Sequence, residues 1–89
     1  MEPGQEFLIR VSLERGRQQK IWGNTHDDNL NPTEWSGVLL HVAGKVAHAN
    51  EDGMYDERKR RLIQLAATCL AEYEAIERRG VAVTGVNDG

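Results

Sequence analysis

A chain of 89 residues is short enough for one domain, and alone it buries a modest share of its surface, so a second copy is the simplest way to enlarge its core. Its 14 acidic and 11 basic side chains leave a formal net charge of −3, which excludes a strong overall field for capturing nucleic acid or anionic lipid. No apolar run approaches the roughly 20 residues that span a bilayer, and the first residues lack the pattern of a secretory signal. We therefore expect a cytoplasmic protein that binds neither membranes nor nucleic acid.

The single cysteine, Cys69, has no second cysteine with which to form an internal disulfide. It lies inside the apolar run from residue 65 to 71, where a small buried thiol is a more common role than a nucleophile. We expect a buried, unreactive side chain in a reducing compartment.

The first predicted helix covers residues 5–22. Its apolar side chains fall near one side and its charged side chains, Glu14, Arg15, Arg17 and Lys20, largely on the other. Gly16 in its middle weakens the helix, which suggests a bend or a close approach by a neighbour. The pair Gly23 and Asn24 is expected to end it.

The second predicted helix begins at Pro32, because Asn31 is a good N-cap and Glu34 completes a variant of the capping box. Two stripes of side chains run along this helix. One is apolar and the other consists mainly of small residues: Trp35, Leu39, Val42, Val46 and Ala49 form the first, and Gly37, Leu40, Gly44 and Ala47 the second. A helix that is apolar on two sides predicts a buried, central position.

The third predicted helix covers about residues 55–79, with acids in its first turn and basic residues in its last. It is also apolar on more than one side, so we expect a homodimer whose interface uses the second and third helices. The prediction is thus a single all-α domain over residues 1–80. Residues 81–89 carry no helical pattern and are expected to form a flexible tail.

Three segments resemble one known family. Residues 14–23 (ERGRQQKIWG), 35–49 (WSGVLLHVAGKVAHA) and 62–67 (LIQLAA) are similar to helices of small, often phage-encoded MazG-like proteins of the all-α nucleoside triphosphate pyrophosphohydrolase superfamily. The resemblance implies a three-helix unit that completes a helical bundle as a homodimer. Active members carry Glu-Glu-x-x-Glu on one helix and Glu-x-x-Asp on the next, and these acids hold Mg²⁺ over the triphosphate.

In this chain the positions of those acids hold no carboxylate. The glutamate positions fall on His41, Val42 and Lys45, and the acid pair falls on Arg61 and Gln64. The resemblance therefore implies a phage or prophage protein without cofactor or catalysis, which acts in the bacterial cytoplasm as a small binding or regulatory module. An inhibitor of a host protein is one such module.

Two alternatives stay open. His26, Asp27 and Asp28, joined by His41, could replace the missing acids in a divergent Mg²⁺-dependent pyrophosphohydrolase, which leaves the question of enzymatic activity undecided. In the second alternative, a nucleotide-binding pseudoenzyme, Lys45 and Arg61 form an anion-binding site and hold phosphates directly.

Two surface features have both structural and functional interpretations. Asp27 and Asp28 are expected to make turn and capping contacts, and the same His-Asp-Asp turn also resembles a feature of phage members without the acid motif, which makes it a candidate recognition turn. The basic run of residues 58–61 is expected to be a solvated face interleaved with ion pairs. In the other interpretation, Arg58, Lys59 and Arg60 dock an acidic partner.

Overall fold

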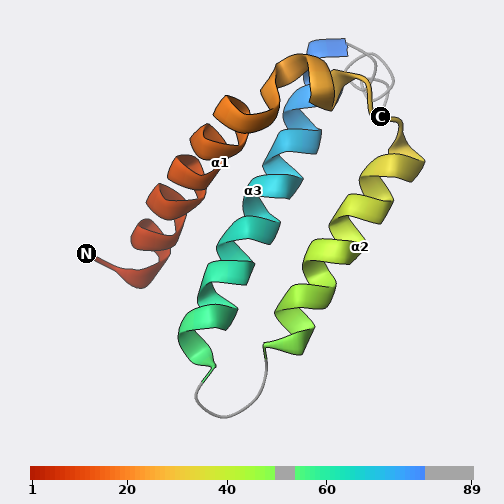
Figure 1. Cartoon of the computed structure of the whole chain (residues 1–89). Coiled ribbons are helices and arrows are strands. Elements are labelled where there is room, and N and C mark those ends of the chain that lie inside the picture. The colour runs from red at the N-terminus through yellow and green to blue at the C-terminus, as the bar shows by residue number, and fades with distance from the viewer. Residues whose placement is uncertain (50–53, 80–89) are drawn as a thin grey trace, which may run out of the picture.

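The computed structural model describes residues 1–49 and 54–79, which form three helices, α1 (Pro3–Asp28), α2 (Pro32–His48) and α3 (Tyr55–Arg79) (Figure 1). The all-α prediction is confirmed. No helix in this described part is long and apolar enough to cross a membrane. The tail predicted for residues 81–89 lies outside the described residues.

The third helix is the central one. Both α1 and α2 pack along α3, while the described residues of α1 and α2 make no comparable contact with each other (Figure 1). The expectation that the second helix is central is wrong, because α2 buries one side only, through Trp35, Val42 and Val46. The core positions of α3 are small, Ala67, Thr68, Ala71 and Ala75, which allows a helix to approach from each side.

The small-residue stripe of α2 does not pack within the chain. Its four residues, Gly37, Leu40, Gly44 and Ala47, are all exposed, and a Cβ atom added at either glycine would meet no other atom within 4 Å. Within one chain, nothing in the described residues covers this side of α2.

The start of α2 and the bounds of α3 agree with the prediction. The side chain of Asn31 accepts a hydrogen bond from the Glu34 amide at 2.8 Å, and the Glu34 carboxylate accepts one from the Asn31 amide at 2.9 Å. This reciprocal pair satisfies two amides that a helix start would otherwise leave without partners. In the same first turn of α2, Trp35 packs with Leu30 against Ala71 and Ala75 to form the core.

The first helix differs from the prediction at its C-terminal end. Gly23 does not end α1: it leaves helical geometry for one residue, with φ 77° and ψ 167°, and the helix resumes to Asp28. The result is a kink, after which the last turn folds back toward α3 (Figure 1). At Gly16 the helix is regular, and neither the expected bend nor a neighbouring group occurs there in the described residues.

Two predictions about burial are wrong. Cys69 is exposed, because it lies on the side of α3 turned away from both packed helices, together with the exposed Leu62 and Tyr73. Arg15, assigned to the charged outer side of the first helix, is buried. Its carboxylate partners come from elsewhere in the chain, which the local pattern does not show.

Candidate binding site

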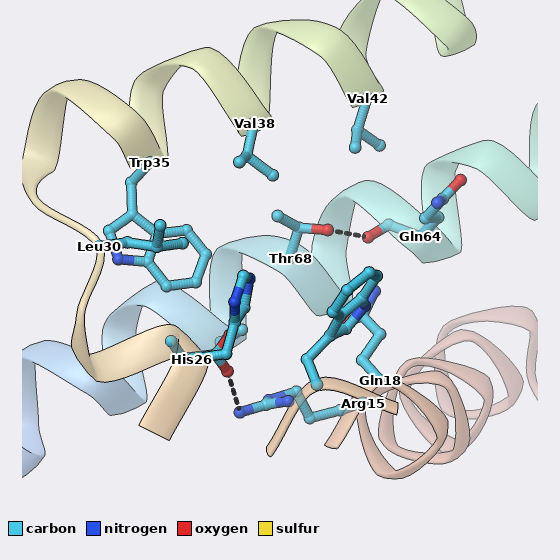
Figure 2. Close-up of a pocket in the computed structure, with 12 residues that line it drawn as sticks. Arg15, Gln18, His26, Leu30, Trp35, Val38, Val42, Gln64 and Thr68 are labelled. Atoms are coloured by element: carbon cyan, nitrogen blue, oxygen red, sulfur yellow. Dashed lines mark hydrogen bonds and ion pairs between the residues drawn. The ribbon is translucent and has the colours of Figure 1, made fainter. Parts of the chain in front are cut away.

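A pocket of about 220 Å³ lies where the kinked end of α1 faces α2 above α3 (Figure 2). The α2 wall is apolar, with Trp35, Val38 and Val42, and the α3 floor carries Gln64 and Thr68. The α1 wall supplies Arg15, Gln18, Trp22, His26 and Asp27, and Leu30 and Ala71 complete the lining. Such a mixture of aromatic walls with a few polar groups is typical of small-ligand sites.

Arg15 fixes the α1 wall of this pocket. Its Nη2 lies 3.2 Å from a carboxylate oxygen of Asp27, beyond the kink, and its Nε donates to Glu74 of α3 at 2.8 Å. The side chains of Arg15 and Asp27 are only 6% and 9% exposed. A buried charge is tolerated when it is paired, so these contacts hold the folded-back turn against α3.

The three residues of the candidate recognition turn have three different neighbours. His26 stacks on Trp22 with 5.1 Å between the ring centroids, Asp27 binds Arg15, and Asp28 binds Arg78 at 2.7 Å. The hydrogen bond from Arg78 holds the pKa of Asp28 below its ordinary value. The two aspartates thus make structural contacts, as expected, although these are ion pairs to distant residues rather than local capping contacts.

The alternative metal site is not assembled in the described residues. His41 lines a different hollow from His26 and Asp27, and both aspartates are engaged by arginines. Within residues 1–49 and 54–79, no three histidine, cysteine, aspartate or glutamate side chains gather closely enough to hold a metal ion.

The five positions that the sequence resemblance aligns with acids divide between two adjacent hollows. Val42 and Gln64 line the pocket described above, and His41, Lys45 and Arg61 line a second, more open hollow of about 480 Å³. The remaining lining of the second hollow is Gly44, His48, Ala49, Met54 and Glu57. Arg61 joins the two hollows, because its Nη1 donates to the Gln64 side chain at 2.9 Å. Lys45 and Arg61 therefore share a hollow with His41, whereas Gln64 lines the neighbouring pocket.

The second hollow is basic, but part of its charge is neutralised. Arg61 donates to Glu57 at 2.8 Å, and Arg60 binds the same carboxylate at 2.9 Å. Hydrogen bonds from Arg60 and then Arg61 hold the pKa of Glu57 below its ordinary value, so the carboxylate stays ionised. Lys45 has no ion pair among the described residues, which do not include the nearby acids Glu51 and Asp52.

The basic run at the start of α3 does not gather on one surface. Arg58 donates to the Val46 carbonyl of α2 at 3.1 Å, Arg60 binds Glu57, and Lys59 lines another small hollow beside Phe7 of α1. The expected pattern of basic residues interleaved with ion pairs is confirmed for Arg60 and Arg61.

The pocket of about 220 Å³, which we call the aromatic pocket because Trp22 and Trp35 line it, is not evident from the sequence pattern. One feature of the sequence could have indicated it. Leu8, Arg15 and Trp22 are spaced seven residues apart, which puts one arginine in line with apolar residues on a single helix face. The sequence pattern places Trp22 on one side of a single helix, but the kink that brings His26 against it depends on the backbone of Gly23.

Comparison with known proteins adds no further assignment. No protein-family model, curated protein or solved structure matches the chain. What is shown is a small all-α domain of three helices.

Proposed function

We propose that this chain is a MazG-like protein of phage or prophage origin that acts without catalysis, as a small dimeric binding or regulatory module in the cytoplasm of a bacterial host. Its partner in this proposal is a host protein. The family proposal rests on the three segments at residues 14–23, 35–49 and 62–67, which fall on the three helices, with Ala49 as the C-cap of α2.

The observation that carries the proposal is the charge of the second hollow. Lys45 and Arg61 occupy it from two helices, where the resembled enzymes hold a divalent cation with carboxylates. Mg²⁺ needs several oxygen ligands and is repelled by two cationic side chains. Among the described residues, the lining holds one carboxylate, that of Glu57, and two arginines already bind it.

A metal-binding reversion tests this proposal. We expect the natural chain to release no pyrophosphate from nucleoside triphosphates with Mg²⁺ or Mn²⁺, and to show no Mn²⁺ binding by electron paramagnetic resonance. Restoring four acids, through His41→Glu, Lys45→Glu, Arg61→Glu and Gln64→Asp, should create Mn²⁺ binding, since all four positions are at least partly exposed. Val42 is left unchanged because it is buried.

Pyrophosphate release by the natural chain that is lost in an Asp27→Ala, Asp28→Ala double variant would instead support the divergent hydrolase. Failure of the folded reversion variant to bind Mn²⁺ would count against the alignment with the family's metal site.

A nucleotide-binding pseudoenzyme is the second candidate, and one arrangement favours it. The aromatic pocket, with Trp22 and Trp35, adjoins the basic hollow, and the Arg61–Gln64 hydrogen bond connects them. A base could occupy the first while Lys45 and Arg61 contact phosphates in the second. Binding of nucleotides without hydrolysis is the expected result for this candidate.

A further inference from the structure

The stretch of chain beyond the kink of α1 contains no apolar side chain. Its residues 24–29, which we call the flap, read Asn, Thr, His, Asp, Asp and Asn, and Asp27 alone among these six is buried. By contrast, the packing of the three helices uses buried apolar residues such as Val11, Val42 and Ala71. Apolar burial is the main favourable contribution to folding, and the flap lacks it.

Arginines hold the flap in place instead. Besides the buried contact of Arg15 with Asp27, the last turn of α3 supplies a second set of contacts, which we call the latch. Arg78 binds the Asp28 carboxylate at 2.7 Å, and Arg79 donates to the backbone carbonyl of Asp28. The side chains of Arg78 and Asp28 are 30% and 37% exposed. Ion pairs open to water contribute little stability, so the latch is easily released.

Gly23 gives the flap a hinge where it leaves the body of α1. Its φ of 77° and ψ of 167° lie outside the helical region, while the residues before and after it are helical. Glycine passes between positive and negative φ at little steric cost. At its other end the flap continues through Leu30 and Asn31 into α2. It is therefore tethered on both sides and can lift without leaving the fold.

The flap forms part of the wall of the aromatic pocket. His26 and Asp27 line the pocket, and Leu30, directly after the flap, packs with Trp35 (Figure 2). Trp35 is only 4% exposed although it lines the pocket from α2. Displacement of the flap would thus open the pocket toward Trp35.

We propose that the flap is a lid over the aromatic pocket, hinged at Gly23 and fastened by the latch, which lifts while the three helices stay packed. Segments without buried apolar contacts open at a lower free-energy cost than the core of a protein. Because the latch is ionic, charge rather than unfolding controls access to the pocket. The inference depends neither on a protein partner nor on the absence of catalysis, so its failure would leave the proposed function unaffected.

Hydrogen exchange of backbone amides, followed by mass spectrometry, reports the opening of the flap. The amides of Asn29 and Leu30 donate to carbonyl oxygens of the flap at 3.2 Å, so they exchange slowly while the flap is closed. A single helical turn is unstable by itself, so these hydrogen bonds break once the flap lifts. Exchange at these two amides therefore measures how often the lid opens.

A matched pair of double variants tests the latch. Arg78→Ala with Arg79→Ala removes it, and we expect exchange in the flap to become at least about tenfold faster while exchange in the rest of α1 and in α2 stays the same. Arg10→Ala with Arg60→Ala removes the same charge from exposed ion pairs outside the flap and should leave flap exchange unchanged.

Equal acceleration throughout the three helices would show that the flap opens only when the whole chain unfolds, and would overturn the proposal. Unchanged exchange in the flap of the latch variant would overturn it as well.

A change of chirality at position 23 tests the hinge. The observed φ and ψ of Gly23 are the mirror image of the extended conformation that L-residues favour, so a D-residue adopts them without strain. A chemically synthesised chain with D-alanine at this position should hold the flap closed and slow its exchange, whereas Gly23→Ala should speed it. The same direction of change in both chains would overturn the hinge.

Quenching of tryptophan fluorescence by acrylamide, a small neutral probe, tests whether the flap covers the pocket. Trp22→Phe leaves Trp35 as the single tryptophan of the chain. In this background we expect weak quenching, because Trp35 is buried, and stronger quenching once Arg78→Ala and Arg79→Ala are added. Faster exchange in the flap without stronger quenching of Trp35 would show that the flap moves but is not a lid, and would overturn the proposal.

Discussion

Arg15 and Glu74 are 59 positions apart in the chain and are joined by a 2.8 Å hydrogen bond from the Arg15 Nε to the Glu74 carboxylate. The same guanidinium binds Asp27 beyond the kink of α1. One side chain therefore ties the body of α1, its folded-back last turn and the central helix α3 together. The Arg15 side chain also lines the aromatic pocket.

Replacing Arg15 by alanine should lower the free energy of unfolding by about 3 kcal/mol, because the buried carboxylate of Asp27 is left without a counter-charge. Urea denaturation followed by circular dichroism measures this. Arg10→Ala is the control, since its pair with Glu6 is exposed and should contribute less than about 0.5 kcal/mol. Equal losses in the two variants would contradict the role assigned to Arg15.

Gly23→Ala should destabilise the protein by about 1–3 kcal/mol, because a φ of 77° with a ψ of 167° is accessible almost only to glycine. We also expect the near-ultraviolet circular dichroism signal to change, since the kink positions Trp22 against His26. Gly37→Ala is the matched control: its backbone φ is not positive and the added Cβ meets nothing, so it should stabilise by up to about 1 kcal/mol. A Gly23→Ala variant as stable as the natural chain would show that the kink is not required.

Acid should remove the contribution of the pair between Asp28 and Arg78. The pKa of Asp28 is lowered in the folded state, so its ionised form stabilises the fold above the ordinary value of 3.8, and this stabilisation is lost as the pH falls through the lower folded value. The natural chain should therefore unfold at a higher temperature than Asp28→Asn at pH 7, and the difference should shrink as the pH falls below about 4. A difference that persists unchanged at pH 2 would assign the effect of the substitution to something other than charge.

A thermal-shift screen separates the two candidate functions. If the chain is a protein-binding module only, nucleotides and inorganic phosphates should leave its melting temperature unchanged. For a nucleotide-binding pseudoenzyme, one nucleotide class should raise the melting temperature in a saturable way, and Lys45→Glu should abolish the rise. Lys20→Glu, an exposed change of the same charge on α1, should preserve it.

The prediction of helix bounds from sequence succeeded where local chemistry decides the outcome. Asn31, Pro32 and Glu34 specify the start of α2 within four residues, and the acids and basic residues at its two ends bound α3. These signals act through hydrogen bonds and helix dipoles that a neighbouring helix does not alter.

Burial followed from the sequence only in part. Trp35, Val42 and Val46 belong to the predicted apolar stripe and are buried, but Cys69 is exposed and Arg15 is not. Hydrophobic pattern tells which residues favour the interior, while the limited number of helices in one chain decides how many faces can be covered.

The chain alone is enough to predict the all-α class, the capped start of α2, the limits of α3 and the absence of acids at His41, Lys45 and Arg61. The packing of the helices establishes that α3 is central, that α1 continues beyond Gly23, and that Arg15 contacts Glu74 and Asp27. Helix capping and amphipathic spacing act over a few residues and are legible in the chain. The choice of a central helix and of partners for a buried charge depends on which faces meet in space, and these contacts join residues far apart in sequence.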